Sequence, residues 1–342
     1  MKSQFKKSRA PGQRATLSKT LALTLAAGLQ LGLASVARSA PASSCNDSLR
    51  AQISLDTQAQ DQRYRAMGHG GIRPGNEAQF REGTNGRAVL VLHGFLASPF
   101  EVESIAVRLN QEGFTVYSPL VFGFGTDAQN ANQVTMADYR QSVQTSFEHL
   151  STCYDDISLV GMSWGAALAS DFVLNNSLGQ KVRSLVLISP YFKAKQFGAE
   201  AINKWTSKYI DVLPSWVAQL TAPNDHRVFR LYPQFHTPGL PLLTVIESLK
   251  FCDSLPVIDQ TKKEAGLAWQ SPLPTLVVTT DADETVDPEF GRQYAADHYP
   301  HLISMTYQKA LRIPHQIPVA DVNPQLPALL DRIVAHLQPV KK

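Results

Sequence analysis

The chain has 342 residues, 44% hydrophobic and 18% charged, which suits one large α/β domain or two small ones and excludes a chain that is disordered throughout. Seven of the 32 basic residues lie in residues 1–40, so the rest of the chain carries 25 basic against 29 acidic residues, a net charge of −4. A mildly acidic chain has no electrostatic attraction to nucleic acid, which is therefore not an expected partner.

Residues 1–40 have the pattern of a signal peptide. A basic stretch up to Lys19 contains no acidic residue, an apolar run covers residues 21–36, and small residues follow over 37–42. This order predicts cleavage between residues 37 and 42, and the apolar run is shorter than the ~20 residues that a membrane span needs. We expect an exported protein, periplasmic or secreted, with no stable membrane span after signal removal. An uncleaved signal anchor is the alternative.

Residues 43–84 are expected to form a leader segment before the main domain. Asn46 and Asp47 can cap a polar helix that runs to about Met67, after which glycines and prolines break the pattern.

Three cysteines follow the signal segment: Cys45, Cys153 and Cys252. Export permits one disulfide among them, and the sequence does not identify the pair. The chain contains no Cys-x-x-Cys or His-x-x-x-His spacing, so a metal site is not expected.

From residue 85 onward, strands and helices alternate. Residues 88–92 are a continuous apolar run, typical of a strand that is buried on both faces of a parallel sheet. Further strands are expected at 114–118, 157–160, 182–188, 276–279 and 303–308, and helices at 99–110, 136–150, 166–175, 288–298 and 324–337. The alternation predicts an α/β fold, with a mostly parallel central sheet flanked by helices over residues 85–342.

Residues 191–270 interrupt this alternation. They form helix-like pieces with scattered prolines and with the aromatic residues Trp205, Tyr209, Trp216, Phe229, Tyr232 and Phe235. Because the alternation resumes afterwards, we interpret the stretch as a helical cap inserted late in the sheet. A separate small domain is the alternative.

A serine lies between two glycines where the strand at 157–160 meets the helix at 166–175. The motif is Gly161-Met162-Ser163-Trp164-Gly165. A sharp strand-to-helix turn exposes the serine hydroxyl at the carboxyl edge of the sheet, and only small flanking residues permit such a turn. The helix N-terminus adds free N–H groups that favour developing negative charge. We therefore predict that Ser163 is a nucleophile.

His93-Gly94-Phe95 follows the first clear strand. In the presence of Ser163, this loop predicts an oxyanion hole with the N–H groups of Phe95 and Trp164 as its donors. A plain strand-ending turn is the alternative.

A nucleophilic serine needs an acid and a base later in the chain. Four carboxylates follow the strand at 276–279: Asp281, Asp283, Glu284 and Asp287. Asp287 is placed to cap the next helix. Asp283 lies in the middle of the loop, past the end of the strand, and is the predicted acid, with Asp281 as the second choice.

The predicted base is His315, which follows the last strand at the carboxyl edge of the sheet. His298 and His301 flank the turn before that strand, so they lie at its amino end, away from Ser163. His336 lies near the end of the last helix, where a surface cation is favoured. The chain order Ser163, Asp283, His315 is the order that this architecture uses.

These residues resemble the α/β-hydrolase superfamily, and most of all bacterial carboxylesterases and monoacylglycerol lipases with a His-Gly-Phe oxyanion loop. The resemblance covers residue 85 to the C-terminus apart from much of the cap, and it includes the glycine-rich turn Phe122-Gly123-Phe124-Gly125-Thr126. The family usually has glycine where Thr280 stands, and it often has glycine where Pro314 stands. Trp164 replaces a smaller aliphatic residue of the family, which predicts a narrower pocket.

The resulting prediction is an exported serine hydrolase that cleaves carboxylic esters, small-molecule or lipid, through an acyl-enzyme and without a metal or organic cofactor. A serine aminopeptidase-like peptidase of the same fold and a non-catalytic binding protein on a hydrolase scaffold are the alternatives. The sequence leaves the oligomeric state, the acyl chain length and the physiological substrate open.

Overall fold

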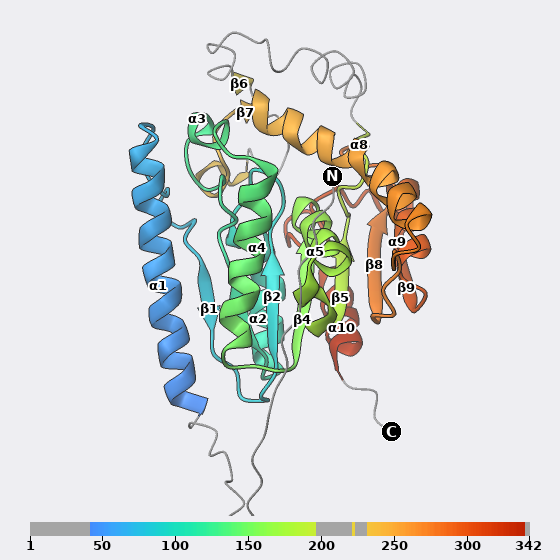
Figure 1. Cartoon of the computed structure of the whole chain (residues 1–342), viewed down its shortest axis with the longest axis horizontal. Coiled ribbons are helices and arrows are strands. Elements are labelled where there is room, and N and C mark those ends of the chain that lie inside the picture. Colours follow the sequence, from blue (N-terminus) through green and yellow to red (C-terminus); the bar gives the residue numbers. More distant parts are fainter. Residues whose placement is uncertain (1–41, 196–220, 223–230, 339–342) are drawn as a thin grey trace, which may run out of the picture. The chain divides into compact units, whose positions relative to one another are not determined.

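The structure is a computed structural model, and it describes residues 42–195, 221–222 and 231–338 (Figure 1). The chain divides into two units, residues 1–39 and 40–342, and every described residue belongs to the second unit. The predicted signal segment and the cap aromatics Trp205, Tyr209, Trp216 and Phe229 lie outside the described residues.

A seven-stranded sheet forms the centre of the described unit, in the order β1-β3-β2-β4-β5-β8-β9. The strands are β1 (Gln79–Arg81), β2 (Ala88–Leu92), β3 (Thr115–Ser118), β4 (Ile157–Met162), β5 (Val182–Ile188), β8 (Thr275–Thr280) and β9 (Leu302–Tyr307). Every neighbouring pair is parallel except β1 and β3, which confirms the predicted mostly parallel sheet. β5 pairs directly with β8, so the residues that connect these two strands add no strand to the central sheet.

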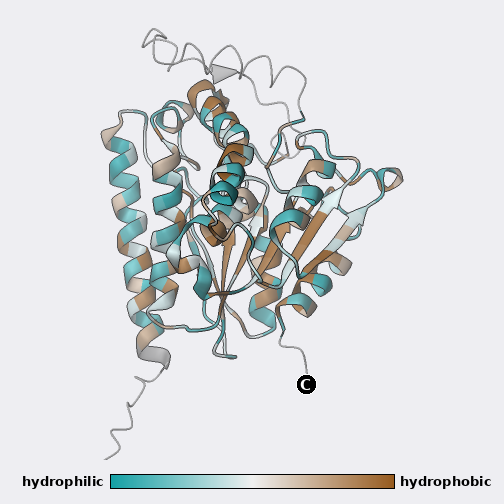
Figure 2. Ribbon diagram, turned by 45° about the vertical axis from the view of Figure 1, so that its right-hand side comes forward, coloured by the Kyte–Doolittle hydropathy of each residue, from teal (hydrophilic) through white to brown (hydrophobic). Residues whose placement is uncertain are grey.

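Helices cover both faces of this sheet. The α-helices of the described residues are α1 (Ala42–Ala66), α2 (Glu103–Gln111), α3 (Ala128–Ala131), α4 (Met136–Ser151), α5 (Trp164–Asn175), α8 (Leu242–Glu264), α9 (Pro288–His298) and α10 (Leu326–Leu337). One hydrophobic core lies between the sheet and α2 and α10, and a larger core lies between the sheet and α1, α4, α5 and α9. Figure 2 shows apolar strands between helices whose outer faces are polar, the expected pattern for amphipathic helices on a buried sheet.

The insertion contributes α8 and a short two-stranded sheet of β6 (Thr221–Ala222) and β7 (Leu240–Pro241). Figure 1 shows α8 crossing above the ends toward which the strand arrows point, which are the carboxyl ends of the parallel strands. Its inner side chains Phe251, Cys252 and Leu255 are buried in the larger core.

Two features of the N-terminal part differ from the prediction. α1 begins at Ala42, so Asn46 lies inside the helix and the expected cap was wrong. The Asn46 amide instead donates to Glu82 and its carbonyl accepts from the Tyr154 hydroxyl, which satisfies a polar group that is buried. β1 was not predicted, because three half-buried residues at a sheet edge carry no periodic signal.

A disulfide joins Cys45 in α1 to Cys153, which lies just after α4, across a sequence separation of 108. This contact identifies the pair that the sequence left open. Cys252 is free and buried in α8. No helix in the described part of the chain combines the length and the apolar character that a membrane span requires.

Candidate active site

Ser163 lies at the turn between β4 and α5, in a backbone conformation with φ of 52° and ψ of −113°. A positive φ is uncommon for residues other than glycine, and it marks a sharp turn that the surroundings must hold. The Ser163 N–H donates to Ile188 in β5, and its carbonyl accepts from Ala167 and from Tyr191. Neighbouring segments therefore fix the serine on both sides.

The two flanking glycines are required by close packing. A Cβ on Gly161 would lie 2.4 Å from the carbonyl oxygen of Gly165, and a Cβ on Gly165 would lie 2.4 Å from that of Leu92. Both contacts are with backbone, which cannot swing away. The glycines thus allow α5 to pack against the ends of β2 and β4, as the motif predicted.

Ser163, His315 and Asp283 form one hydrogen-bonded chain. The distance from Ser163 Oγ to His315 Nε2 is 2.7 Å, and that from His315 Nδ1 to Asp283 Oδ2 is also 2.7 Å. All three side chains are buried. The other Asp283 oxygen, Oδ1, accepts from the N–H groups of Thr285 and Val286, so both oxygens of the carboxylate are occupied.

The electrostatics of the pair match its geometry. Burial acts to raise the pKa of Asp283, but the neighbouring His315 and the hydrogen bonds to the carboxylate bring the pKa below its ordinary value. Burial acts to lower the pKa of His315, but Asp283 and, more weakly, Glu101 bring it above its ordinary value. A carboxylate that stays ionised beside an imidazole of raised basicity is suited to general-base chemistry.

Asp281 and Asp287, two other carboxylates of the same loop, have different partners from Asp283. Asp281 forms an ion pair with Arg292, and Asp287 caps α9 by accepting from Glu289 and Phe290, as predicted. Neither carboxylate contacts His315 in the described residues.

Two of the other candidate histidines, His298 and His336, have structural partners. His298 Nε2 contacts Asp259, and its Nδ1 contacts the Tyr294 carbonyl. The expectation of a surface cation at His336 was wrong, because this half-buried ring contacts Ser184 and burial lowers its pKa.

His93 fixes the loop that carries Phe95. Its Nδ1–H donates to the Gly94 carbonyl at 2.9 Å, and its Nε2 accepts from the Val121 N–H at 3.0 Å. Both nitrogens are used as in a neutral ring, and burial lowers the pKa of His93 to about 4. His93 is therefore a structural anchor. The Leu96 carbonyl, accepting from Thr237, adds a second anchor.

The two predicted oxyanion donors come from neighbouring segments of the chain. Phe95 follows the end of β2, and Trp164 is the first residue of α5, so its N–H has no acceptor within the helix. The rings of Phe95 and Trp164 meet edge to face, with centroids 6.1 Å apart.

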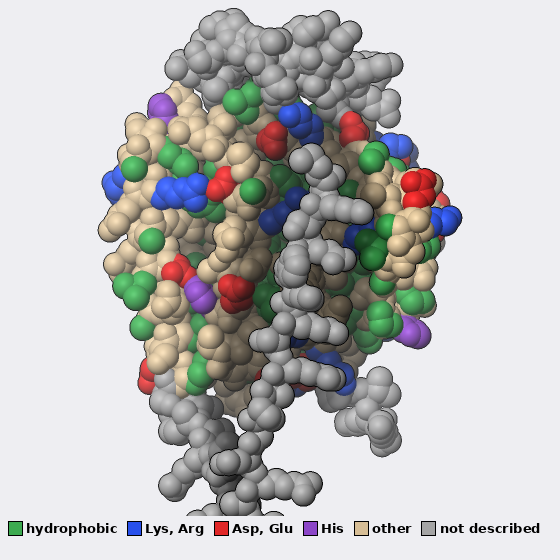
Figure 3. All heavy atoms as spheres, in the orientation of Figure 1, with side chains coloured by type: hydrophobic (Ala, Val, Ile, Leu, Met, Phe, Trp, Pro, Cys, Tyr) green, Lys and Arg blue, Asp and Glu red, His purple; other side chains and the backbone are tan. Residues whose placement is uncertain are grey.

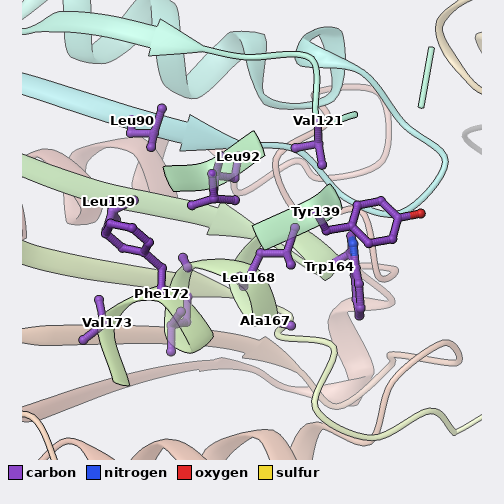
Figure 4. Packing of buried hydrophobic residues seen from close by; sticks show 14 of the residues in the cluster. Leu90, Leu92, Val121, Tyr139, Leu159, Trp164, Ala167, Leu168, Phe172 and Val173 are labelled. Carbon is purple, nitrogen blue, oxygen red and sulfur yellow. The ribbon is translucent and has the colours of Figure 1, made fainter. Parts of the chain in front are cut away.

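The Trp164 side chain is fully buried among aromatic rings. Edge-to-face contacts join it to Phe95, Tyr139, Tyr191 and Phe251, with centroid distances between 5.2 and 6.1 Å. Figure 4 shows the indole nitrogen on the side of the Tyr139 ring. The indole N–H has no hydrogen-bond partner in the described residues. The indole fills space directly behind the serine turn.

Two residues near the site were not predicted to contribute to it. Thr280 donates its hydroxyl to the Ile313 carbonyl at 2.7 Å and so connects the end of β8 to the loop of His315. Glu101 is buried beside Gly94 and accepts its N–H. A sequence signal for Glu101 existed, because it lies four residues before Ile105 on the apolar face of the predicted helix.

The visible surface carries charges of both signs. Figure 3 shows Lys and Arg interspersed with Asp and Glu over the face it presents. Within the described residues, no group of three or more His, Cys, Asp or Glu side chains is arranged to hold a metal ion.

The model of the family described as serine aminopeptidase, S33, matches residues 83–306, more than half of the chain. The matched segment contains Ser163 and Asp283 and ends before His315.

Among characterised relatives, a carboxylesterase of Bacillus subtilis (strain 168) is 30% identical over 84 residues, which are 24% of this chain and 34% of the relative. A thermostable monoacylglycerol lipase of Bacillus sp. (strain H-257) is 30% identical over 80 residues, 23% of this chain and 32% of the relative. The chain thus matches about a third of the length of each.

Solved structures show the same fold. One from work on the metagenome-derived lipolytic enzymes LipS and LipT has a TM-score of 0.60 at 17% identity, covering 78% of this chain and 98% of that one. A monoglyceride lipase of Saccharomyces cerevisiae has a TM-score of 0.59 at 12% identity, covering 76% of this chain and 90% of that one.

Proposed function

We propose that this chain is an exported serine hydrolase that cleaves carboxylic esters. The chain belongs to the serine aminopeptidase S33 family of α/β-hydrolases. The observation that supports the proposal most directly is the hydrogen-bonded chain from Ser163 Oγ through His315 to Asp283. A serine hydroxyl becomes a useful nucleophile when a base within hydrogen-bond distance is itself oriented by a third group.

In the proposed mechanism, Ser163 Oγ attacks the acyl carbonyl while His315 Nε2 takes its proton. Asp283 keeps the other ring nitrogen protonated and stabilises the imidazolium. The alcohol leaves with the proton that His315 returns, and water, deprotonated by the same ring, then releases the acid. The N–H groups of Phe95 and Trp164 stabilise the oxyanion, and each such donor contributes on the order of 10²–10³ in rate.

The relatives guide the proposed substrate class. One is a carboxylesterase and one a monoacylglycerol lipase, which favours an ester over an amide for this chain. The half-exposed ring of Phe95, beside the proposed oxyanion donor and packed against Trp164 and Tyr191, supports an apolar acyl or alcohol group. The family description keeps an aminopeptidase as the second candidate.

Export is proposed from two features. The signal-like pattern of residues 1–40 predicts it, and the disulfide between Cys45 and Cys153 supports it, because such bonds persist in oxidising compartments.

The test compares hydrolysis of p-nitrophenyl esters of increasing acyl length with hydrolysis of aminoacyl amides by the mature protein. Ser163→Ala should lower ester hydrolysis by more than ~10³-fold and abolish labelling by a fluorophosphonate probe. Ser54→Ala, an exposed serine of α1, is the matched control and should retain both. Full esterase activity in Ser163→Ala would refute the nucleophile, and faster cleavage of amides would favour the peptidase.

A further inference from the structure

Glu101 is a buried carboxylate for which the mechanism above has no role. It lies in the 3₁₀ turn Pro99–Val102 that precedes α2, and only 4% of it is exposed. An acid is almost never buried to this degree unless something holds it, because desolvation of the charge is costly. Its position therefore points to specific partners.

The first partner is the oxyanion loop. Glu101 Oε2 accepts the Gly94 N–H at 2.7 Å, directly before the peptide that presents the Phe95 N–H. A short bond from a buried N–H to a carboxylate is one of the stronger hydrogen bonds in proteins. It fixes the orientation of the Gly94 peptide and, through it, of the next one.

The second partner is the catalytic pair. A Cβ on Gly94 would lie 2.7 Å from Glu101 Oε2 and 3.3 Å from Ser163 Cβ, so a single glycine separates the carboxylate from the nucleophile. Glu101 and His315 also influence each other's ionisation. His315 is thus hydrogen-bonded to one carboxylate, that of Asp283, and interacts electrostatically with a second, that of Glu101.

Asp283 and Glu101 act to raise the pKa of His315, and His315 acts to lower that of Glu101. The other charged or titratable groups near Glu101 line a cavity with it: Glu103, Arg108, Tyr232 and Asp321. His236 acts on the neighbouring His93. His93 contacts the same glycine but is neutral because burial lowers its pKa to about 4. Burial raises the pKa of Glu101 to about 7, against the effects of the Gly94 bond and His315, so Glu101 changes charge near neutral pH.

We propose that Glu101 is a positioning residue for the oxyanion hole, and that its charge also stabilises the His315 imidazolium in the transition state. This inference rests on the proposed serine hydrolase function. The carboxylate acts through Gly94 and His315 and does not touch the substrate.

Two variants distinguish the effect of the side-chain length of Glu101 from the effect of its charge. Glu101→Gln keeps the length of the side chain and removes the charge, and Glu101→Asp keeps the charge but is one methylene too short for Gly94. Glu103→Gln is the matched control, because Glu103 lies two residues away and pairs with Arg81 instead.

Steady-state kinetics on a short p-nitrophenyl ester, normalised to active sites by fluorophosphonate titration, provide the readout. Glu101→Gln should lower kcat about tenfold or more with KM little changed. The acid limb of the kcat/KM profile should move to lower pH, because removal of the Glu101 charge lowers the pKa of His315. Glu101→Asp should also lose kcat but keep the limb near its wild-type pH. Glu103→Gln should change neither.

A purely structural role predicts a different result. Glu101→Gln would then lower the fraction of titratable sites or the melting temperature, while kcat per active site and the acid limb stayed as in the wild type. That outcome would overturn the proposal. Failure of the proposed function is distinguishable, because it appears as activity that survives Ser163→Ala.

Discussion

The disulfide between Cys45 and Cys153 should contribute measurably to stability. It closes a loop with a sequence separation of 108, and the chain-entropy model assigns about 4.7 kcal/mol to a loop of ~100 residues. Measured losses for native disulfides are about 2–5 kcal/mol, so this bond belongs at the upper end of that range. At about 2 °C per kcal/mol for a large domain, removal should lower Tm by roughly 8–10 °C.

The experiment is urea and thermal unfolding of the Cys45→Ser/Cys153→Ser double variant beside the oxidised wild type. Cys252→Ser is the control, since this buried thiol forms no disulfide and its change tests the loss of a sulfur from the core. The oxidised wild type should unfold at higher urea than the double variant, and reduction should erase the difference. Equal midpoints for the oxidised wild type and the double variant would refute the reasoning.

Three further predictions concern the site. The pKa of His315 is raised, and the ring must be neutral to act as a base. The value of kcat/KM should therefore increase with pH through a midpoint above the ordinary histidine pKa. A pH–rate profile with its acid midpoint below pH 6 would contradict this. Asp283→Asn should lower kcat by about 10⁴ while the fold, checked by circular dichroism, is kept; a loss of less than tenfold would contradict the role of Asp283. Gly165→Ala should destabilise the fold by about 1–3 kcal/mol or more in urea unfolding, because its Cβ would lie 2.4 Å from the Leu92 carbonyl oxygen; wild-type stability would show that α5 can shift freely.

Much of the fold could be predicted because it depends on local patterns. The continuous apolar run of β2 and the glycine-flanked serine after β4 each identify an element without reference to the rest of the chain. The expected helix at 288–298 coincides with α9, because Asp287 and Pro288 form a strong N-terminal signal.

The remaining features depend on contacts between distant residues. The choice of Asp283 over Asp281 rested on its place in the loop, and the structure adds a reason, the ion pair of Asp281 with Arg292. The partner of Cys45 and the burial of Asn46 are likewise set by the packing of α1 on the domain. For the same reason the apolar-face position of Glu101 did not reveal its role, because its partner is the loop of Gly94, which is distant in the chain.

The packing of α1 bears on how the protein should be produced in recombinant form. The Tyr64 hydroxyl accepts from the Gly123 N–H and donates to the Phe124 carbonyl, and the Phe124 ring in turn packs against Phe95. A gene trimmed to residues 83–306, the segment of family similarity, would lose this hydroxyl at one end and His315 at the other. Expression boundaries should therefore keep α1 with its cysteine and extend through α10.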